Sequence, residues 1–467
     1  MPRGNQHKPL PPDEDLHPLV EYYWRLGFSD QSVVAHVLDH FDKSQYGFSV
    51  KSLQRVRMKL GLRGTRQQQA SFETIAPFVQ EIRERFPTMG ARQMVTTLRQ
   101  DYSLKVPEAT IARFLKGTEP EAVELRKARR FRRKRFWSAG VMDILTIDQR
   151  KRFGLWLHIG LDPFPGRIAW LKIWWCNRNP RLINSYYIEA GRKIGGIPLI
   201  TQSDRGTENN VVANCHTVTR HWLDPSLVGT LQHRWCVEKT NIKPEIAWSQ
   251  LRRQFTPGFE SHLDFGYNNG LYNPDDPLEK LVFRWLAIPW LQAELDAWTW
   301  RFNSSPRRAD KHKLLPQGIP NIIHAKPHLY GSQDFKEWVQ PHSPVFQLVP
   351  PTFAKQITTL YQTMGEPAVS CLTFWKIYQD LLALFRALPD DPQLAEALHL
   401  ADEGANEEVQ FLAGLRELRH GDNVVGEHGY VYYGGLENPP SLDDQGSDAG
   451  FNVENIVDLR EYADFSD

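Results

Sequence analysis

The chain has 467 residues, enough for about three domains of ordinary size, and its 41% hydrophobic and 24% charged residues are typical of folded globular proteins rather than disordered ones. No apolar run approaches the roughly 20 residues of a membrane span, and the polar first residues predict no signal peptide. Four cysteines, Cys176, Cys215, Cys236 and Cys371, form neither a disulfide framework nor a CxxC zinc pattern, which favours a reducing, intracellular compartment.

The net charge of +1 conceals a strong asymmetry along the chain. Residues 401–467 contain sixteen acidic and three basic residues, whereas residues 1–400 contain 53 basic and 39 acidic ones. A basic body with an acidic tail predicts a polyanionic partner, with nucleic acid as the first candidate.

The N-terminal part begins with a polar, proline-rich stretch, residues 1–17, which we expect to be disordered. Residues 18–66 then predict three short helices, with Ser29 and Ser49 as N-caps of the second and third. In the third helix Lys51 and Arg55 fall on the face opposite the apolar positions. The arrangement is typical of a helix-turn-helix unit, and these two cations are candidate DNA contacts.

A second helix-turn-helix-like unit is predicted over residues 67–125, with Ile75, Val79 and Ile82 on one helical face. For both units the alternative is a small helical bundle without a ligand. DNA binding is favoured because a basic linker, residues 126–138, follows directly.

Eight of the ten residues in 126–135 are Lys or Arg. The arginines that we expect to contact DNA here are Arg126, Arg129, Arg130, Arg132, Arg133 and Arg135. The alternative is a solvated linker face, but so dense a run repels itself unless a phosphate backbone or an import receptor neutralises it. We therefore expect a nuclear protein.

From residue 139 the pattern changes to strands. Runs at 141–148, 153–161 and 168–175, a helix over 179–196 and a strand at 198–202 predict an α/β fold with a mixed sheet. Further on, we expect amphipathic helix over 274–304 with a break at Pro289, a helical extension over 326–400, and a mostly disordered acidic tail over 401–467.

Two aspartates close strands of this predicted sheet. Asp148 ends the first strand and Asp204 follows the fourth, so neighbouring strands would bring both carboxylates to one edge. Such a pair is stabilised by a divalent cation, and hard oxygen ligands suit Mg²⁺ or Mn²⁺. A third carboxylate would come from Glu245, one residue after a helix-starting Pro244, or from Glu238.

Other acidic residues nearby have structural interpretations. Asp143 lies five positions before Asp148 and therefore on the opposite face of its strand, and Asp162 falls in a predicted turn. Glu208, one helical turn beyond Asp204, could support that residue.

Four segments together resemble the catalytic core of the integrase superfamily, which includes retroviral and retrotransposon integrases and related transposases. They are LTID at 145–148, SDRGTEN at 203–209, N-x-x-x-E-x-x-W-S-x-L-R at 241–252 and WTWRFNSSPRR at 298–308. The likeness covers 139–325 and is nearest to fungal integrase-core-domain proteins, in which two helix-turn-helix units precede the core.

The resemblance implies a ribonuclease-H-like fold and an enzyme that cuts and joins phosphodiesters of double-stranded DNA. It implies that Asp148, Asp204 and Glu245 are catalytic and hold two Mg²⁺ or Mn²⁺ ions. Arg252 and Arg253, together with Lys172, are candidate contacts to the DNA backbone.

Two other functions stay open. The first is a non-catalytic DNA-binding protein derived from a transposable element, which the changed residues at 149–151 and 243–244 favour. The second is a scaffold whose C-terminal region binds protein, with the acidic tail as a handle for the partner or as an internal mimic of DNA. The sequence also leaves the oligomeric state open, a homo-oligomer included.

Overall fold

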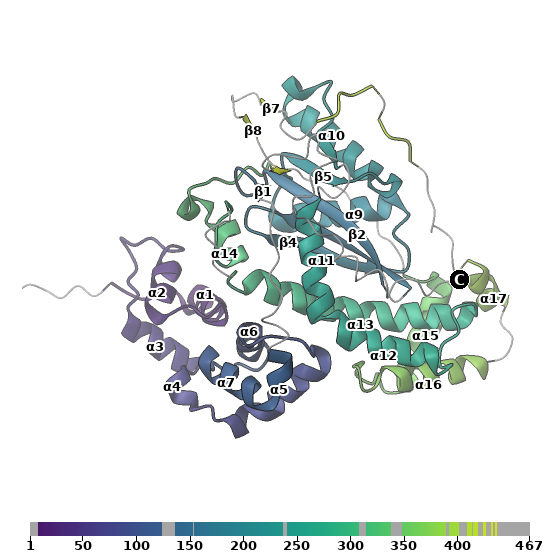
Figure 1. Ribbon diagram of the computed structural model, residues 1–467, viewed down its shortest axis with the longest axis horizontal. Coiled ribbons are helices and arrows are strands. Elements are labelled where there is room, and N and C mark those ends of the chain that lie inside the picture. Colours follow the sequence, from purple (N-terminus) through teal and green to yellow (C-terminus); the bar gives the residue numbers. More distant parts are fainter. Residues whose placement is uncertain are drawn as a thin grey trace, which may run out of the picture.

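The computed structural model has a mixed five-stranded sheet with helices on both of its faces. A helical N-terminal part precedes this sheet (Figure 1). The structure describes residues 8–123, 136–152, 154–236, 241–307, 314–337, 348–388, 392–400, 409–412, 414–418, 424–425, 431–432 and 435–436.

The first helical unit consists of α1 (Asp13–Arg25), α2 (Asp30–Leu38) and α3 (Val50–Lys59). The predicted N-caps are confirmed, because the Ser29 hydroxyl accepts from the Ser32 N–H and the Ser49 hydroxyl from the Ser52 N–H, each at 3.2 Å. The predicted disorder of residues 1–17 is wrong from residue 13 onward. Three acidic residues in the first turn of α1 stabilise its N-terminus, and the side chain of Leu16 is fully buried.

The second helical unit contains α5 (Phe72–Arg85), α6 (Ala91–Asp101) and α7 (Glu108–Thr118), after the short α4 (Thr65–Gln68). Ile75, Val79 and Ile82 are buried as predicted. Their apolar cluster continues without a break into the helices and strands of the central part. The first unit instead has a core of its own, which also contains Ile319 and Ile322 from later in the chain.

The sheet has the strand order β4-β3-β2-β5-β6, so the predicted α/β class and a mixed sheet are confirmed. β3 pairs antiparallel with both of its neighbours, whereas β5 runs parallel to β2 and β6. The five strands of this sheet are β2 (Ile144–Arg152), β3 (Leu155–Asp162), β4 (Arg167–Trp174), β5 (Ile200–Asp204) and β6 (His233–Cys236).

The two faces of the sheet are covered by different helices (Figure 1). α9 (Pro180–Ile194) and α10 (Asn210–Leu223) pack on the face that carries Leu145 and Ile147. α11 (Ile242–Gln254) and α13 (Pro277–Ser304) pack on the opposite face, over β3 and β4.

The predicted break at Pro289 is wrong, because α13 runs through this proline as one helix of 28 residues. A proline inside a helix removes one backbone hydrogen bond. Burial of the neighbouring Ile288, Trp290 and Leu291 against surrounding elements offsets that loss.

The remaining helices surround α13. They are α12 (Thr256–Asn268), α14 (Pro320–Ala325), α15 (Pro351–Thr363), α16 (Phe374–Arg386) and α17 (Pro392–His399), with 3-10 turns η1 (Thr207–Asn209), η2 (Pro225–Leu227) and η3 (Pro327–Tyr330). None of the helices in the described part of the chain is both long and apolar enough to cross a membrane.

Part of the predicted disordered tail is ordered against the sheet. β9 (Gly435–Leu436) pairs with β1 (Phe136–Trp137), and Leu418 is buried beside Leu199 and Ile200. The other short pair is β7 (Val424–Val425) with β8 (Val431–Tyr432). The expectation of a mostly disordered tail is therefore wrong for β9, Arg416 and Leu418, because backbone pairing or apolar burial attaches them to earlier parts of the chain.

Candidate active site

Asp148 and Asp204 lie side by side on neighbouring parallel strands. The register of β2 and β5 pairs Ile147 with Ser203, and each of these is followed directly by one of the aspartates. This confirms the prediction that the two aspartates lie on neighbouring strands. The prediction that Asp148 ends its strand is wrong, because residues 149–152 still pair with β3 and extend β2 to Arg152. The sequence alone indicated the arrangement because each aspartate follows an apolar strand run.

α11 is fastened to β2 at two consecutive residues. Asn241 Nδ2 donates to the Ile147 carbonyl at 2.8 Å, and Trp248 Nε1 donates to Asp148 Oδ2 at 2.9 Å. Glu245 stands between these two contacts, in the first turn of the helix, and is exposed. The helix begins at Ile242, two residues before the Pro244 start that the sequence predicted.

The spacing of Asn241, Glu245 and Trp248 in the sequence places them close together on one helix, but it does not predict the two hydrogen bonds to β2. Residues four before and three after Glu245 lie on neighbouring turns of one helix. The two flanking side chains fix the helix on β2, and Glu245 is thereby held where its charge raises the pKa of both aspartates.

The three carboxylates influence one another electrostatically. Burial, with the charge of Asp204 and then that of Glu245, raises the pKa of Asp148 to about 7. Hydrogen bonds from the Gln149 N–H, at 2.8 Å, and from Trp248 oppose that shift. Burial and the charge of Glu245 also raise the pKa of Asp204. Each ionised carboxylate therefore raises the free energy that is needed to ionise the next one.

A fourth carboxylate, Glu208, lies beside Asp204. Burial and the charge of Asp204 raise the pKa of Glu208, and Asn209 Nδ2 donates to Glu208 Oε1 at 3.0 Å. Gly206 allows this fold-back, because a Cβ at that position would collide with the Glu208 carboxylate. Glu208 thus adds negative charge to the site in addition to supporting the loop after Asp204.

The chemistry of this donor set suits a hard divalent cation, since only a positive charge relieves the mutual repulsion of several carboxylates. Within the described ranges, however, no three His, Cys, Asp or Glu side chains are already close enough to hold one ion together. Glu238, the alternative third ligand, lies outside the described residues.

The predicted DNA contacts are distributed over several elements. Lys51 and Arg55 are exposed on α3, while Arg252 is half-buried and Arg253 is exposed near the end of α11. Lys172 forms an ion pair with Glu189 at 2.9 Å. The arginines of the basic run all fall outside the part of the chain that the structure describes: Arg126, Arg129, Arg130, Arg132, Arg133 and Arg135.

The segment 298–308 has a structural role on the far side of the sheet. Asn303 Oδ1 accepts from the Ile168 N–H and its Nδ2 donates to the Ile168 carbonyl, both at 2.9 Å. Gln292, also on α13, pairs with the backbone of Ile173 and Leu171 in the same way. α13 thereby provides hydrogen-bond partners for backbone groups of Ile168, Leu171 and Ile173 on the outer edge of β4. These groups could otherwise pair with another strand.

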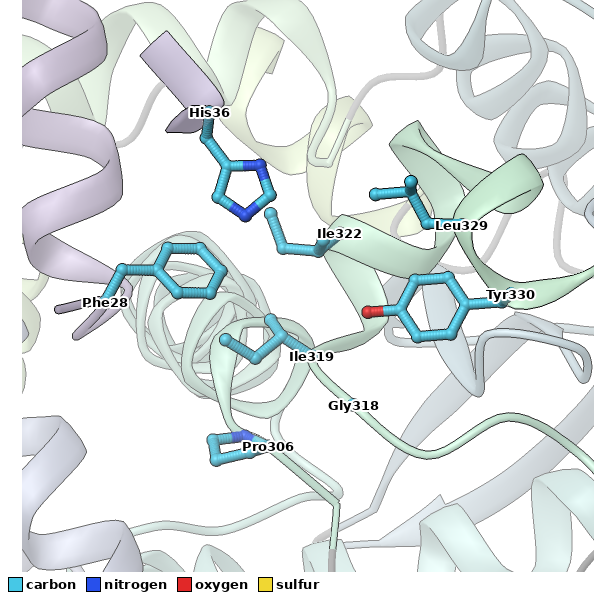
Figure 2. Close-up of a pocket in the computed structure, with 8 residues that line it drawn as sticks. All are labelled: Phe28, His36, Pro306, Gly318, Ile319, Ile322, Leu329 and Tyr330. Atoms are coloured by element: carbon cyan, nitrogen blue, oxygen red, sulfur yellow. The ribbon is translucent and has the colours of Figure 1, made fainter. Parts of the chain in front are cut away.

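A cavity of about 460 Å³ lies between the first helical unit and the α14 region, away from the carboxylates. Figure 2 shows the Tyr330 hydroxyl pointing towards Ile319 and Ile322, with His36 and Phe28 on the opposite side. Its other lining residues are Pro306, Gly318 and Leu329. The cavity marks an apolar junction between two parts of the chain, with no carboxylate in its wall.

Neither the protein-family models nor the curated proteins include a match to this chain.

Proposed function

We propose that the protein is an integrase- or transposase-like polynucleotidyl transferase that cuts and joins phosphodiesters of double-stranded DNA in the nucleus. The observation that supports this most is that Asp148 and Asp204 lie on neighbouring strands of a mixed α/β sheet and that the charge of Glu245 raises the pKa of both. The proposal includes a ribonuclease-H-like arrangement of the core, in keeping with the order of the four motifs along 145–308.

Asp148, Asp204 and Glu245 would together hold Mg²⁺ or Mn²⁺. Two such ions would supply the positive charge that activates a water or a DNA 3′-hydroxyl and stabilises the leaving oxygen. The protein's own contribution is orientation. Trp248 and the Gln149 N–H each hold one oxygen of Asp148, and Asn241 fixes the helix that carries Glu245.

Substrate binding would come from cations around this site and on the helical units. Lys51 and Arg55 on α3 present charge to solvent, and Arg253 and Arg252 follow Glu245 along α11. The basic run 126–135 joins the helical units to the sheet along the sequence. Contacts of this kind position the duplex without reading its sequence.

A non-catalytic DNA-binding protein is the second candidate. It is favoured by the residues next to the carboxylates, which at 149–151 and 243–244 differ from those usual in the family that the core resembles. In that case the carboxylates would be retained without a cation, and DNA binding by the helical units would be the whole function.

Metal binding and DNA cutting in the full chain distinguish the two candidates. Mn²⁺ binding, followed by calorimetry or electron paramagnetic resonance, together with Mg²⁺-dependent nicking or joining of duplex DNA, would support the enzyme. Tight duplex binding without either property would support the second candidate. A chain that binds neither metal nor DNA would exclude both.

The basic run has its own test. Replacing the cations of 126–135 by glutamine should weaken binding to all duplexes similarly, and the slope of log K against log salt should fall by roughly 0.9 for each lost phosphate contact. An unchanged slope would assign the run to a role other than DNA binding.

A further inference from the structure

The segment 409–418 lies across the flank of the candidate active site, beside Asp204. Figure 1 shows this C-terminal segment passing next to α10. Asn210 Nδ2 donates to the Val409 carbonyl at 3.2 Å, and Asn214 Nδ2 donates to the Gln410 carbonyl at 3.0 Å. The Leu412 N–H returns a bond to Asn214 Oδ1 at 3.1 Å.

Arg205, the residue directly after Asp204, is part of the same surface. Its Nη2 atom lies 2.7 Å from Glu417 Oε2, and both side chains are substantially exposed. On β6, the Trp235 ring meets Phe411 edge to face at a centroid distance of 5.6 Å. Trp235 precedes Cys236, which pairs with Asp204 in the sheet register.

The two ends of the segment are held differently. Arg416 forms backbone hydrogen bonds with Gly229 and Leu231, and Leu418 is buried, so this end is firmly attached. Residues 409–412 and Glu417 are held by side-chain contacts near the surface. Exposed contacts of this type contribute little each, and a ligand of similar chemistry can replace them.

The groups that hold the segment are those that proteins use to bind DNA backbones. Arginine guanidinium and asparagine amide groups donate hydrogen bonds to phosphate oxygens as readily as to carboxylates and carbonyls. The bound segment contains one acidic residue, Glu417, and one basic residue, Arg416. It presents the Glu417 carboxylate and the carbonyl oxygens of Val409 and Gln410 to the same donors that a DNA strand would meet.

We propose that Arg205, Asn210 and Asn214 form a DNA-backbone contact surface beside the candidate active site, and that residues 409–412 and the Glu417 side chain of the same chain occupy this surface until DNA displaces them, while Arg416 and Leu418 stay attached. The inference rests on the DNA binding proposed above and adds a specific surface and an internal competitor. Glu417 competes directly with phosphate for Arg205.

A double-mutant cycle in the full chain tests this competition. Glu417→Gln, Arg205→Gln and the double variant are compared with the unaltered protein by fluorescence anisotropy on a 30-base-pair duplex over a range of salt concentrations. Glu417→Gln should tighten binding roughly threefold to tenfold and steepen the salt slope by about 0.9, because Arg205 becomes available to a phosphate. Arg205→Gln should then cost clearly more affinity in the Glu417→Gln background than in the unaltered protein.

The matched control is Glu366→Gln, which removes one exposed negative charge in the loop between α15 and α16. It should leave the affinity and the salt slope nearly unchanged. Equal effects of Glu366→Gln and Glu417→Gln would show that the change in net charge alone explains the change in DNA affinity. That result would overturn the inference. DNA binding with no coupling between Arg205 and Glu417 would also overturn it while leaving the proposed function intact. If no variant binds duplex DNA, the proposed function and this inference both fail.

Discussion

Aspartates stand at both ends of the stretch in which β2 pairs with β5, residues 144–147, but their surroundings differ. At one end Asp143 and Asp162 are buried and accept hydrogen bonds from nearby groups, Asp143 Oδ2 from the Ala139 N–H at 2.8 Å and Asp162 Oδ2 from the Met142 N–H at 3.0 Å. At the other end Asp148 faces further carboxylates, which raise its pKa in addition to burial. A buried acid with donors around it stabilises the fold, whereas acids grouped together create a demand for a cation.

Burial also raises the pKa of Asp143, to about 6, so a raised pKa alone does not separate the two ends. The cause does. At Asp143 the hydrogen bonds from Ala139 and Ser138, which lower the pKa, outweigh the charge of Asp162, which raises it. At Asp148 the charge of Asp204 raises the pKa more than either hydrogen bond lowers it. The same side chain is therefore structural at one end and a candidate for chemistry at the other.

The largest expected effect is at the carboxylate end. Glu245→Gln keeps the size of the side chain but removes a charge that divalent metal needs, so Mg²⁺-dependent nicking or joining should fall at least about 1,000-fold. Duplex binding should stay within about twofold, since phosphate contacts come from other residues. Activity assays and anisotropy on the same preparation measure both.

Glu208→Gln and Glu238→Gln are the matched comparisons for Glu245. Glu208→Gln should reduce activity much less, because Glu208 lies with Asn209 on the loop after Asp204 rather than on α11. Full activity in Glu245→Gln with loss in Glu238→Gln would move the third ligand to the earlier residue.

At the other end, stability should change instead of activity. Asp162→Ala leaves the N–H groups of Met142 and Phe164 without their acceptor in a buried site, which should cost roughly 2–4 kcal/mol of unfolding free energy. Thermal unfolding of the full chain would show the loss as a lower Tm. Unchanged stability with loss of Mn²⁺ binding would contradict the contrast between the two ends.

Trp248 tests how the carboxylate end is organised. Trp248→Phe keeps a buried aromatic ring but removes the N–H that holds Asp148 Oδ2, so Mn²⁺ affinity should fall about 10–100-fold, as for other residues that orient metal ligands. Trp290→Phe is a suitable control, because that ring is buried in the same apolar cluster without touching the carboxylates. Equal Mn²⁺ affinities in the two variants would show that the hydrogen bond is irrelevant to the site.

The smallest effect concerns pH. The folded protein holds the Asp148 proton up to about pH 7, whereas an unperturbed aspartate loses it near 3.8, so the charge costs stability as pH rises between these values. Asp148→Asn should therefore stabilise the metal-free protein by roughly 1–2 kcal/mol at pH 8 and change little below pH 4.

Thermal unfolding in chelator at several pH values measures this gain. Added Mg²⁺ should stabilise the unaltered protein more than Asp148→Asn. The difference in unfolding free energy between the two proteins should therefore become smaller. A gain that is independent of pH would show that the carboxylate charge is not its cause.

Much of the candidate site could be predicted from sequence because its parts are local. Asp148 and Asp204 each follow an apolar run of a strand, although β2 continues past Asp148 to Arg152, and Pro244 indicated a helix that carries Glu245. The bonds from Trp248 to Asp148 and from Asn241 to Ile147 join residues about 100 positions apart, and no local pattern specifies such pairs. The role of Glu208 likewise depends on a loop conformation that only the folded chain defines.

The sequence by itself determined the helices with serine caps, the succession of three strands, a helix and a further strand in the central part, and the two aspartates directly after apolar strand runs. These follow from side-chain periodicity and capping, which act over a few residues. Tertiary structure decided that α13 continues through Pro289, that the second helical unit shares its core with the sheet, and that part of the acidic tail returns to α10 beside Asp204. Each of these outcomes depends on burial and hydrogen bonding between distant segments, and that free energy exists only once the segments have met.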